Sequence, residues 1–351
     1  MTSRPSRQLT GHYRGQAPAQ TIATLVEKGK VVTAEEAVKL IKDGDTITVS
    51  GIGGQGFPEK VMAALEARFL STGEPRNLTQ LDPCPTGTGL GSGIEHTAHE
   101  GLLKRIIESS FWNYPKLRDL ITGNKIEAYA IPLGGAHNLI HETGAGRPYI
   151  TRTGLHTNFD PRHGGGRLNS RTKEDIVKVV SIDGDEYMFY KPYPINVAIV
   201  RGWMADPDGN LSFEGEPLTL GGVRQAMAAK ASGGKVIVQA KYLVARGFLT
   251  ARQVNIPSFF VDAVVIDPQQ PQNYANPAAD NAGQRDTMKA PVPQLGEIPL
   301  NHEKVMARRA AMEIRPGQIL NFGGRDTGVG FTRHFIRRGG AGPGHLHRGA
   351  R

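Results

Sequence analysis

Apolar residues in the first part of the chain follow two different periods. Between Pro58 and Gly73 they recur every three to four positions, which predicts an amphipathic helix with proline at its first position and glycine at its end. The run Thr46–Val49 is short and rich in β-branched residues, which is typical of a strand. Segments of these two kinds alternate along most of the chain, so the pattern predicts an α/β protein.

The same signals predict the remaining elements. Thr33 and Glu36 are spaced as in a capping box, and the helix that they open is predicted to stop at Asp43 and Gly44. Further buried strands are predicted at Leu78–Leu81, Ile126–Ile131, Val177–Ile182, Tyr187–Tyr190, Val197–Val200, Lys235–Gln239 and Ala263–Ile266. Further helices are predicted near residues 97–108, 219–231 and 302–314. Together these elements predict an open parallel or mixed sheet flanked by helices.

Two features interrupt this pattern and suggest domain boundaries. Gln269–Glu297 is rich in Pro, Asn, Gln and Ala and is interpreted as a long irregular connection or linker. Beyond it, Ala310, Ile314 and Gly317 match three residues that stand 273 positions earlier, namely Ala37, Ile41 and Gly44. We therefore expect one complete domain and the start of a duplicated second one. The expected ranges are 1–27 for a basic disordered arm, 28–300 for the complete domain, 301–323 for the start of the second and 324–351 for a basic disordered tail.

Composition limits the class of protein. With 351 residues and 38% hydrophobic content, the chain is long enough for a sizeable core. No run approaches the ~18 apolar residues of a membrane span, and the first residues lack the apolar core of a signal peptide. Cys84 is the single cysteine, which excludes an internal disulfide and a thiolate-rich metal site. A cytoplasmic protein without a membrane partner is the expectation.

The formal charge of +9 is concentrated at the two ends of the chain. Residues 1–20 carry three arginines and no acidic residue, while residues 324–351 carry six arginines and one aspartate. The intervening body is therefore close to neutral and lacks the basic face that binding to nucleic-acid phosphates requires. We expect no nucleic-acid partner.

The segment with the clearest chemical signal is Gly51–Pro58, whose sequence is Gly-Ile-Gly-Gly-Gln-Gly-Phe-Pro. It lies between a predicted strand and a predicted helix, where glycine N–H groups can converge on a phosphate, a carboxylate or a developing oxyanion. The glycines Gly51–Gly56 also satisfy Gly-x-Gly-x-x-Gly, with Asp82 after the next strand as a candidate ribose ligand. A nicotinamide-dependent oxidoreductase is therefore an alternative. A third interpretation is a glycine turn that serves only tight packing.

Other residues with chemical potential are interpreted as structural. His96 and His99 stand three positions apart on a predicted helix, but no third ligand is spaced to complete a metal site with them. His345 and His347 form a weaker pair of the same kind. Cys84 lies between two prolines with no identifiable base, which argues against a nucleophile. Asp206–Asn210 has the composition of a turn. No metal site is predicted.

The stretch Asp43–Pro58 resembles the first signature of the family I CoA-transferases, in which Asp-Gly, an apolar strand and a glycine-rich loop end in Gly-x-Pro. Thr48 and Ser50 stand where that signature usually has an apolar residue and a glycine. Other segments resemble the fused acetate, propionate or short-chain acyl CoA-transferases: His99–Arg105, Asp160–Arg162, Gly165–Asn169, Arg201–Asp206, Gly209–Asn210, Ile256–Pro257 and Val261–Asp262. They occur in order from about Val31 to Phe322, so the chain resembles the first half of such an enzyme.

The resemblance implies a ping-pong transfer of CoA from a short-chain acyl-CoA to a free carboxylate. In the family, a glutamate attacks the thioester and passes through an anhydride to an enzyme-bound glutamyl-CoA thioester. Each tetrahedral step makes an oxyanion that N–H groups such as those of Gly53 and Gly54 would stabilise. Gly56 and Pro58 complete this acyl-site loop. Coenzyme A enters as a substrate, and no further cofactor is implied.

The sequence departs from the family at two catalytic positions. A glutamine in the family adds a side-chain donor to the oxyanion hole, and Leu133 occupies the matching position here. The nucleophilic glutamate belongs to the second half, and no glutamate within residues 28–322 matches its motif. The resemblance therefore implies a CoA-transferase chain that is incomplete and inactive alone. It also leaves open a homo-oligomer, or a non-catalytic subunit that assembles with a complete homologue.

We predict that the reading frame of the gene shifts near codon 323. The family continues into a second glycine loop, whereas Asn321–Gly323 is followed here by Gly-Arg-Asp-Thr. Read one base later, one permitted choice of codons for residues 324–327 gives Val-Gly-Ile-Pro, the expected loop. The same shift over residues 344–350 permits Val-Ile-Ser-Thr-Glu-Glu, which supplies a glutamate.

Resequencing through codon 323 and the bases that follow tests this prediction. The expected result is a second glycine loop in the shifted frame. Stop codons in all frames soon after codon 351, without such a loop, would instead favour a genuine short protein with a basic tail.

Overall fold

The computed structural model describes residues 29–275 except 90 and 112, together with 277, 299–315, 318, 321–322 and 347–348. The arm predicted at 1–27, His345 and most of the tail predicted at 324–351 lie outside the described residues. Within the described part, no helix is both long enough and apolar enough to cross a membrane.

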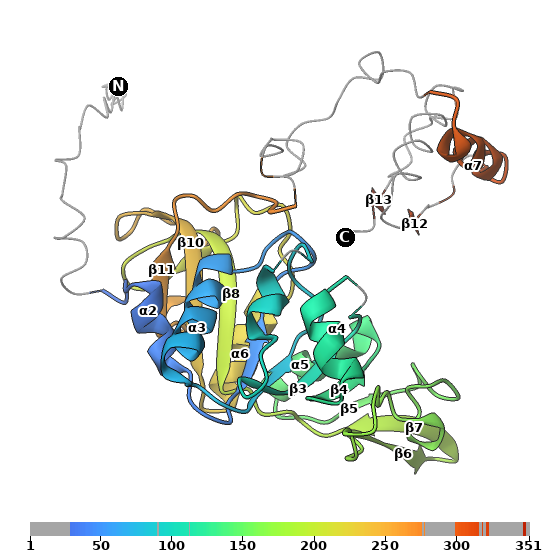
Figure 1. Cartoon of the computed structure of the whole chain (residues 1–351). Helices are drawn as coiled ribbons and strands as arrows, with labels where there is room; N and C mark the ends of the chain where they lie inside the picture. Colours follow the sequence, from blue (N-terminus) through green and yellow to red (C-terminus); the bar gives the residue numbers. More distant parts are fainter. Residues whose placement is uncertain are drawn as a thin grey trace, which may run out of the picture.

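A parallel sheet forms the centre of the fold (Figure 1). Its order is β11-β10-β8-β1-β2-β3-β4, so the chain first adds strands to one side of β1 and then to the other. Short β9 joins β8 in antiparallel pairing. The bounds are β1 Thr46–Val49, β2 Leu78–Leu81, β3 Leu103–Glu108, β4 Glu127–Ala130, β8 Val197–Ala205, β9 Leu211–Ser212, β10 Lys235–Leu243 and β11 Ala263–Ile266. The predicted parallel or mixed sheet is confirmed.

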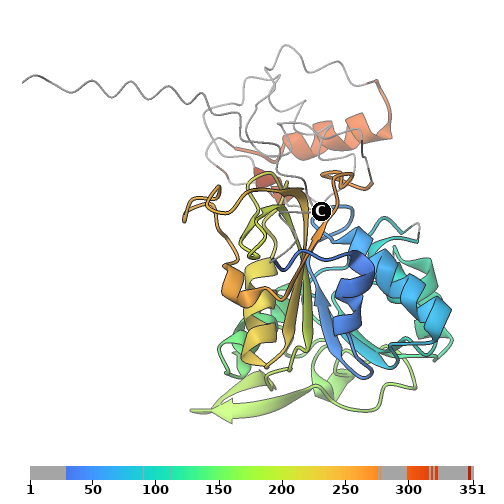
Figure 2. The same ribbon diagram turned by 90° about the vertical axis from the view of Figure 1, so that its left-hand side faces the viewer.

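Helices cover both faces of this sheet (Figures 1 and 2). On one face pack α2 and α3, and on the other α5 and α6, while α4 covers β3 and β4. In β8, Val197 and Ile199 pack in the core beneath α2 and α3, and Ala198 and Val200 pack in the core beneath α5 and α6. Successive side chains of a strand point to opposite faces of the sheet, which explains this alternation. The bounds are α2 Ala34–Ala37, α3 Glu59–Thr72, α4 Pro115–Thr122, α5 Leu133–Gly144 and α6 Gly222–Ala231.

Local signals placed the ends of several elements correctly. Thr33 and Glu36 form the predicted capping box at the start of α2. The helix then continues as a 3-10 turn at Val38–Leu40. α3 follows Pro58 directly and ends at Gly73, whose φ of 75° lies in the left-handed region that favours glycine. The turn predicted at Asp206–Asn210 is confirmed, because the Asp206 carboxylate accepts from the N–H groups of Asp208 and Asn210.

The helix predicted near residues 97–108 is wrong. A 3-10 helix, η2, spans Gly93–Thr97, and β3 begins at Leu103. Gly101 between them has a φ of 94°, which a helix cannot contain. Ile106 and Ile107 are then buried on opposite faces of the sheet, where two adjacent apolar residues suit a central strand. Helices α4 and α5 were not among the predicted elements.

A second correction concerns the strands predicted at Val177–Ile182 and Tyr187–Tyr190. They form β6 Val177–Ile182 and β7 Asp185–Tyr190, which build a separate antiparallel sheet of order β5-β7-β6 with β5 Tyr149–Thr151. This sheet lies at one end of the molecule (Figure 1). Only Val177 of β6 is buried, so β6 is a half-exposed hairpin strand and not the buried strand expected.

The remaining elements are short or stand late in the chain. η3 spans Pro161–His163 and η4 spans Ser258–Phe260. The helix predicted at 302–314 is α7 His302–Ala311, capped by the side chain of Asn301. Two-residue strands β12 Asn321–Phe322 and β13 His347–Arg348 pair in parallel. The domain ranges remain predictions.

We predict that the central strand tolerates truncation poorly. Ile47 of β1 is fully buried between two helical layers, so Ile47→Ala is expected to lower the free energy of unfolding by about 2–5 kcal/mol. The matched control is Ile182→Ala in β6, where the side chain is 43% exposed and the expected change is within about 0.5 kcal/mol. Urea denaturation measures both. Equal losses would contradict the burial described here.

Candidate functional site

The candidate site lies at the carboxyl edge of the parallel sheet, where the strand order changes direction. The chain extends the sheet from β1 through β2 on one side, and β8 joins β1 on the other. In open α/β sheets, ligands bind outside the carboxyl ends of the strands at such a switch point. The glycine loop, residues 51–56, follows β1 at this position. The loop after β2, Glu108 at the end of β3 and Leu133 after β4 lie along the same edge.

The N–H groups of the glycine loop differ in their hydrogen-bond partners. The Gly53 N–H donates to the Pro85 carbonyl at 2.8 Å, and the Gly87 N–H donates back to the Gly53 carbonyl at 2.7 Å. Gly53 therefore ties the loop to the segment after β2. No described residue accepts a hydrogen bond from the N–H of Gly54, whereas the antiparallel bridge between Gln55 and Asn273 turns the N–H of Gly56 towards the Gln272 carbonyl. The Gly54 donor lies just before α3, whose N-terminus favours negative charge.

Ser50 fixes both ends of the glycine loop. Its hydroxyl donates to the Gly56 carbonyl and accepts from the Arg201 N–H of β8, each at 2.9 Å. Thr48 accepts from the amide of Gln225 in α6, which also donates to the Val49 carbonyl. All four side chains are buried. The two positions where the sequence departs from the usual signature therefore hold the base of the loop.

The segment Pro271–Ala275 covers the glycine loop. The Tyr274 N–H donates to the Gly54 carbonyl at 2.8 Å, and the Tyr274 ring packs on Phe57 with centroids 4.7 Å apart. A Cβ built on Gly54 would lie 2.5 Å from the Asn273 side-chain oxygen, so glycine is needed at that position. The start of the region predicted as a linker is thus packed against the site, and this was not foreseen.

A buried ion pair lies beneath this cover. Arg201 Nε donates to Glu216 at 3.0 Å, and Arg201 Nη2 donates to the Pro271 carbonyl at 2.6 Å. Gln270 adds hydrogen bonds to Glu216 and to the Gly202 carbonyl. Burial raises the pKa of Glu216 despite Arg201. Glu216 also lines a cavity of about 500 Å³. Sequence reasoning missed the pair because its members come from distant segments.

Two carboxyl groups at the edge are completely buried. One oxygen of Asp82 accepts from the Val49 N–H at 2.6 Å and the other from the Gln80 amide at 2.5 Å. Burial raises the pKa of Asp82 to about 7, and burial together with the charge of Asp82 raises that of Glu108. Asp82 faces the interior with both oxygens engaged, so its predicted role as a ribose ligand is wrong.

Cys84 also lies at this edge. Its sulfur is 3.9 Å from Nε2 of His137 on α5. Burial and the carboxylates of Glu108 and Asp82 raise the pKa of Cys84 to about 12, while burial and Arg224 lower the pKa of His137. Cys84 is therefore a protonated thiol beside a neutral imidazole, in agreement with the structural role predicted for it.

His96 and His99 contact glutamates of α3. His96 Nε2 lies 3.0 Å from Glu59, its Nδ1 lies 2.5 Å from Glu66, and His99 Nε2 lies 2.6 Å from Glu66. Burial lowers the pKa of His96, but the hydrogen bonds and charges of both glutamates outweigh it and raise the pKa above its ordinary value. The histidines thus brace the start of α3, and η2, not the predicted long helix, carries His96.

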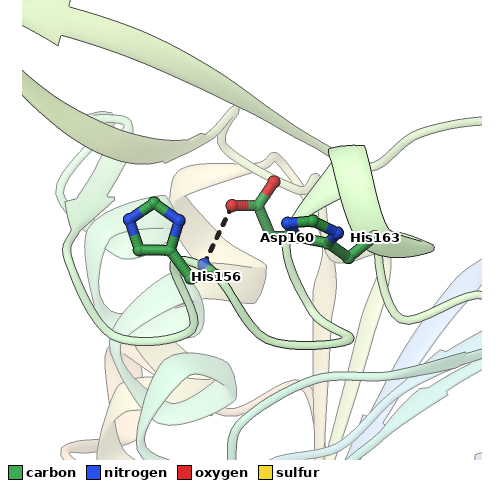
Figure 3. A group of neighbouring side chains, drawn as sticks. All are labelled: His156, Asp160 and His163. Atoms are coloured by element: carbon green, nitrogen blue, oxygen red, sulfur yellow. Dashed lines mark hydrogen bonds between the residues drawn. The ribbon is translucent and has the colours of Figure 1, made fainter.

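His156, Asp160 and His163 form a cluster with metal-ligand chemistry (Figure 3). Asp160 is buried, but its oxygens already accept from the N–H of His156 and from the backbone and guanidinium of Arg162, at 2.8–3.0 Å. These contacts lower the pKa of Asp160 and use the lone pairs that a metal ion would need. The cluster is therefore a loop that is held in place by the hydrogen bonds of Asp160.

Comparison with known proteins shows the family of the chain. The model of the Coenzyme A transferase family matches residues 31–267. The chain belongs to this family. It is 38% identical over 301 residues to the caffeate CoA-transferase of Acetobacterium woodii, covering 84% of this chain and 56% of that one. No finding supports the nicotinamide-dependent alternative.

Two further relatives place this CoA-transferase chain within the family. The crystal structure of the acyl-CoA transferase YdiF from Escherichia coli O157:H7 superposes with a TM-score of 0.80 at 34% identity, covering 88% of this chain and 59% of that one. The chain thus spans a little more than half the length of the caffeate enzyme and of YdiF. It is also 28% identical to the alpha subunit of the acetoacetyl-CoA:acetate/butyrate CoA transferase of Clostridium acetobutylicum, covering 68% of this chain and 98% of that subunit.

We predict that His96 makes stability depend on pH. Because its pKa is raised in the folded state, its contribution is complete below the unfolded value of about 6.5 and is lost as the pH rises through the folded value. His96→Gln should therefore cost about 1–2 kcal/mol at low pH and progressively less at higher pH. Denaturation at several pH values measures this. The exposed His163→Gln serves as control, and an equal cost of His96→Gln at every pH would contradict the prediction.

Proposed function

We propose that the chain takes part in the transfer of coenzyme A between a short-chain acyl-CoA and a free carboxylate. The carrying observation is the N–H donor of Gly54, which has no acceptor among the described residues and lies before a helix N-terminus at the switch point of the sheet. The activities for which the relatives are named, caffeate CoA-transferase and acetoacetyl-CoA:acetate/butyrate CoA transferase, support this class of reaction.

The loop would act on the oxyanions that form when a carboxylate adds to a thioester carbonyl. Backbone N–H groups held rigidly in a site that excludes water stabilise such charge without reorganisation. Ser50 supplies the rigidity, because it ties Gly56 to β8. Gly53, whose N–H is paired with Pro85, shapes the loop, and Pro58 starts α3 beneath it.

Leu133 would give the site an apolar wall in place of a polar donor. It is the first residue of α5, directly after the edge of β4, and its side chain is 43% exposed. An exposed leucine at the same edge of the sheet as the glycine loop suits the hydrocarbon part of a short-chain acyl group. The oxyanion hole then depends on backbone donors alone.

The covalent step requires a carboxylate nucleophile. In the proposed ping-pong cycle a glutamate forms the enzyme-bound CoA thioester, and no glutamate within residues 28–322 matches the position known for the family. The carboxylate would therefore come from a complementary partner subunit, whether or not copies of this chain also form a homo-oligomer. The likeness to an alpha subunit over nearly all of that subunit supports a division of the site between chains.

We predict that propionyl-CoA binds to the 351-residue chain, whereas NAD does not. Acyl exchange with free acetate should be negligible, because loss of one member of a catalytic set removes most of the rate. Gly54→Ala should weaken binding about tenfold, since its Cβ would displace Asn273 and Ala275 from the loop.

Isothermal titration with each ligand, together with an exchange assay using labelled acetate, measures these expectations. The melting temperature of Gly54→Ala serves as the control for folding. NAD uptake would support the dinucleotide alternative. Robust exchange by the chain alone would show that an unrecognised carboxylate in the body carries the reaction.

A further inference from the structure

Asp82 and Glu108 are two carboxyl groups without a balancing cation. Asp82 directly follows β2, and Glu108 is the last residue of the neighbouring parallel strand β3. The Asp82 N–H donates to the Ile107 carbonyl, beside Glu108. Both residues are 0% exposed. Among the described residues, no lysine, arginine or histidine forms an ion pair with either carboxyl group. Two adjacent carboxylates cannot both remain charged in such surroundings at moderate cost.

The hydrogen bonds distinguish the two groups. Each oxygen of Asp82 accepts from an N–H group, which favours its charged form. In Glu108, Oε1 accepts from the backbone and hydroxyl of Ser109, but Oε2 is buried and has no hydrogen-bond partner among the described residues. A proton on Oε2 removes the uncompensated charge, so Glu108 is the better carrier.

The other titratable groups around the pair add no positive charge. Burial keeps the Cys84 thiol and the Tyr114 phenol protonated and neutral. Glu95, which faces Tyr114, is itself acidic. His137 Nε2 lies 3.9 Å from the sulfur of Cys84, and its pKa is lowered. None of these four groups places a positive charge beside the pair.

We propose that Asp82 and Glu108 share a single proton at neutral pH, carried by Glu108, and that this pair positions the glycine loop. The charged Asp82 holds the Val49 N–H at the end of β1, one residue before Ser50 and the loop. Because Glu108 is neutral, no second negative charge lies beside the buried Asp82 carboxylate. Both are positioning residues, since neither is exposed to a ligand. The link to acyl transfer rests on the function proposed above, whereas the shared proton does not.

Infrared difference spectroscopy of the full chain tests the proton directly. Subtracting the spectrum of Glu108→Gln from that of the wild type at neutral pH should leave the carbonyl band of a protonated carboxyl group. In Asp82→Asn this band should disappear at a lower pH than in the wild type, because the neighbouring charge is gone. The matched control is Glu95→Gln, which removes another buried glutamate whose oxygens accept backbone N–H groups, and it should leave the band unchanged.

Two further measurements separate this role from simple packing. Since a raised carboxyl pKa costs stability above the unfolded value of about 4.3, the unfolding constant of Glu108→Gln relative to wild type should fall by up to about tenfold per pH unit above that value. In Asp82→Asn, amide exchange at Val49 should accelerate more than tenfold, while Val238 in β10 stays protected.

The outcomes are distinguishable. No protonated band in the wild type at neutral pH, or a pH-independent effect of Glu108→Gln, overturns the shared proton. Unchanged exchange at Val49 in Asp82→Asn overturns the positioning role. A chain that shows the band but fails to bind propionyl-CoA refutes the proposed function and leaves this inference standing.

Discussion

The hydroxyl of Ser50 is the contact on which the site depends. It joins the last residue of the glycine loop to β8, and so closes the loop across the point where the sheet changes direction. A hydroxyl can do this because it donates and accepts at once. With Gln225 and Asp82 holding the residues just before it, the end of β1 is fixed from three sides. The loop can then present N–H groups without rearranging.

The parts of the fold that were predicted correctly depend on signals within a few residues. The capping pair Thr33 and Glu36, and the helix between Pro58 and Gly73, are decided by local hydrogen bonding and by backbone preferences. The helix predicted over residues 97–108 was wrong because two apolar pairs four positions apart, Leu102–Leu103 and Ile106–Ile107, fit one face of a helix as well as a buried strand. The positive φ of Gly101 decided between them.

Periodicity also could not assign β6 and β7 to their sheet. Alternation reports that one face of a strand is apolar, but not which partner covers it, and β6 pairs with a hairpin neighbour, β7, in a sheet separate from the parallel one. Similarly, the glycine loop was located from sequence, whereas the pairing of Gly53 with Pro85 and the burial of Asp82 depend on contacts between distant segments. Arg201 stood in a segment that resembles the family, but nothing in the sequence indicated its pairing with Glu216.

The cover formed by Pro271–Ala275 has a consequence for whatever follows it in the chain. Tyr274 is hydrogen-bonded to Gly54, so the chain is anchored to the loop at this residue. Any segment joined to it in sequence meets the loop in an intramolecular encounter. The local concentration of such a segment is set by the length of the tether and not by the amount of protein in solution. This anchoring alone would favour contact between the loop and a covalently linked segment over contact with a free competitor.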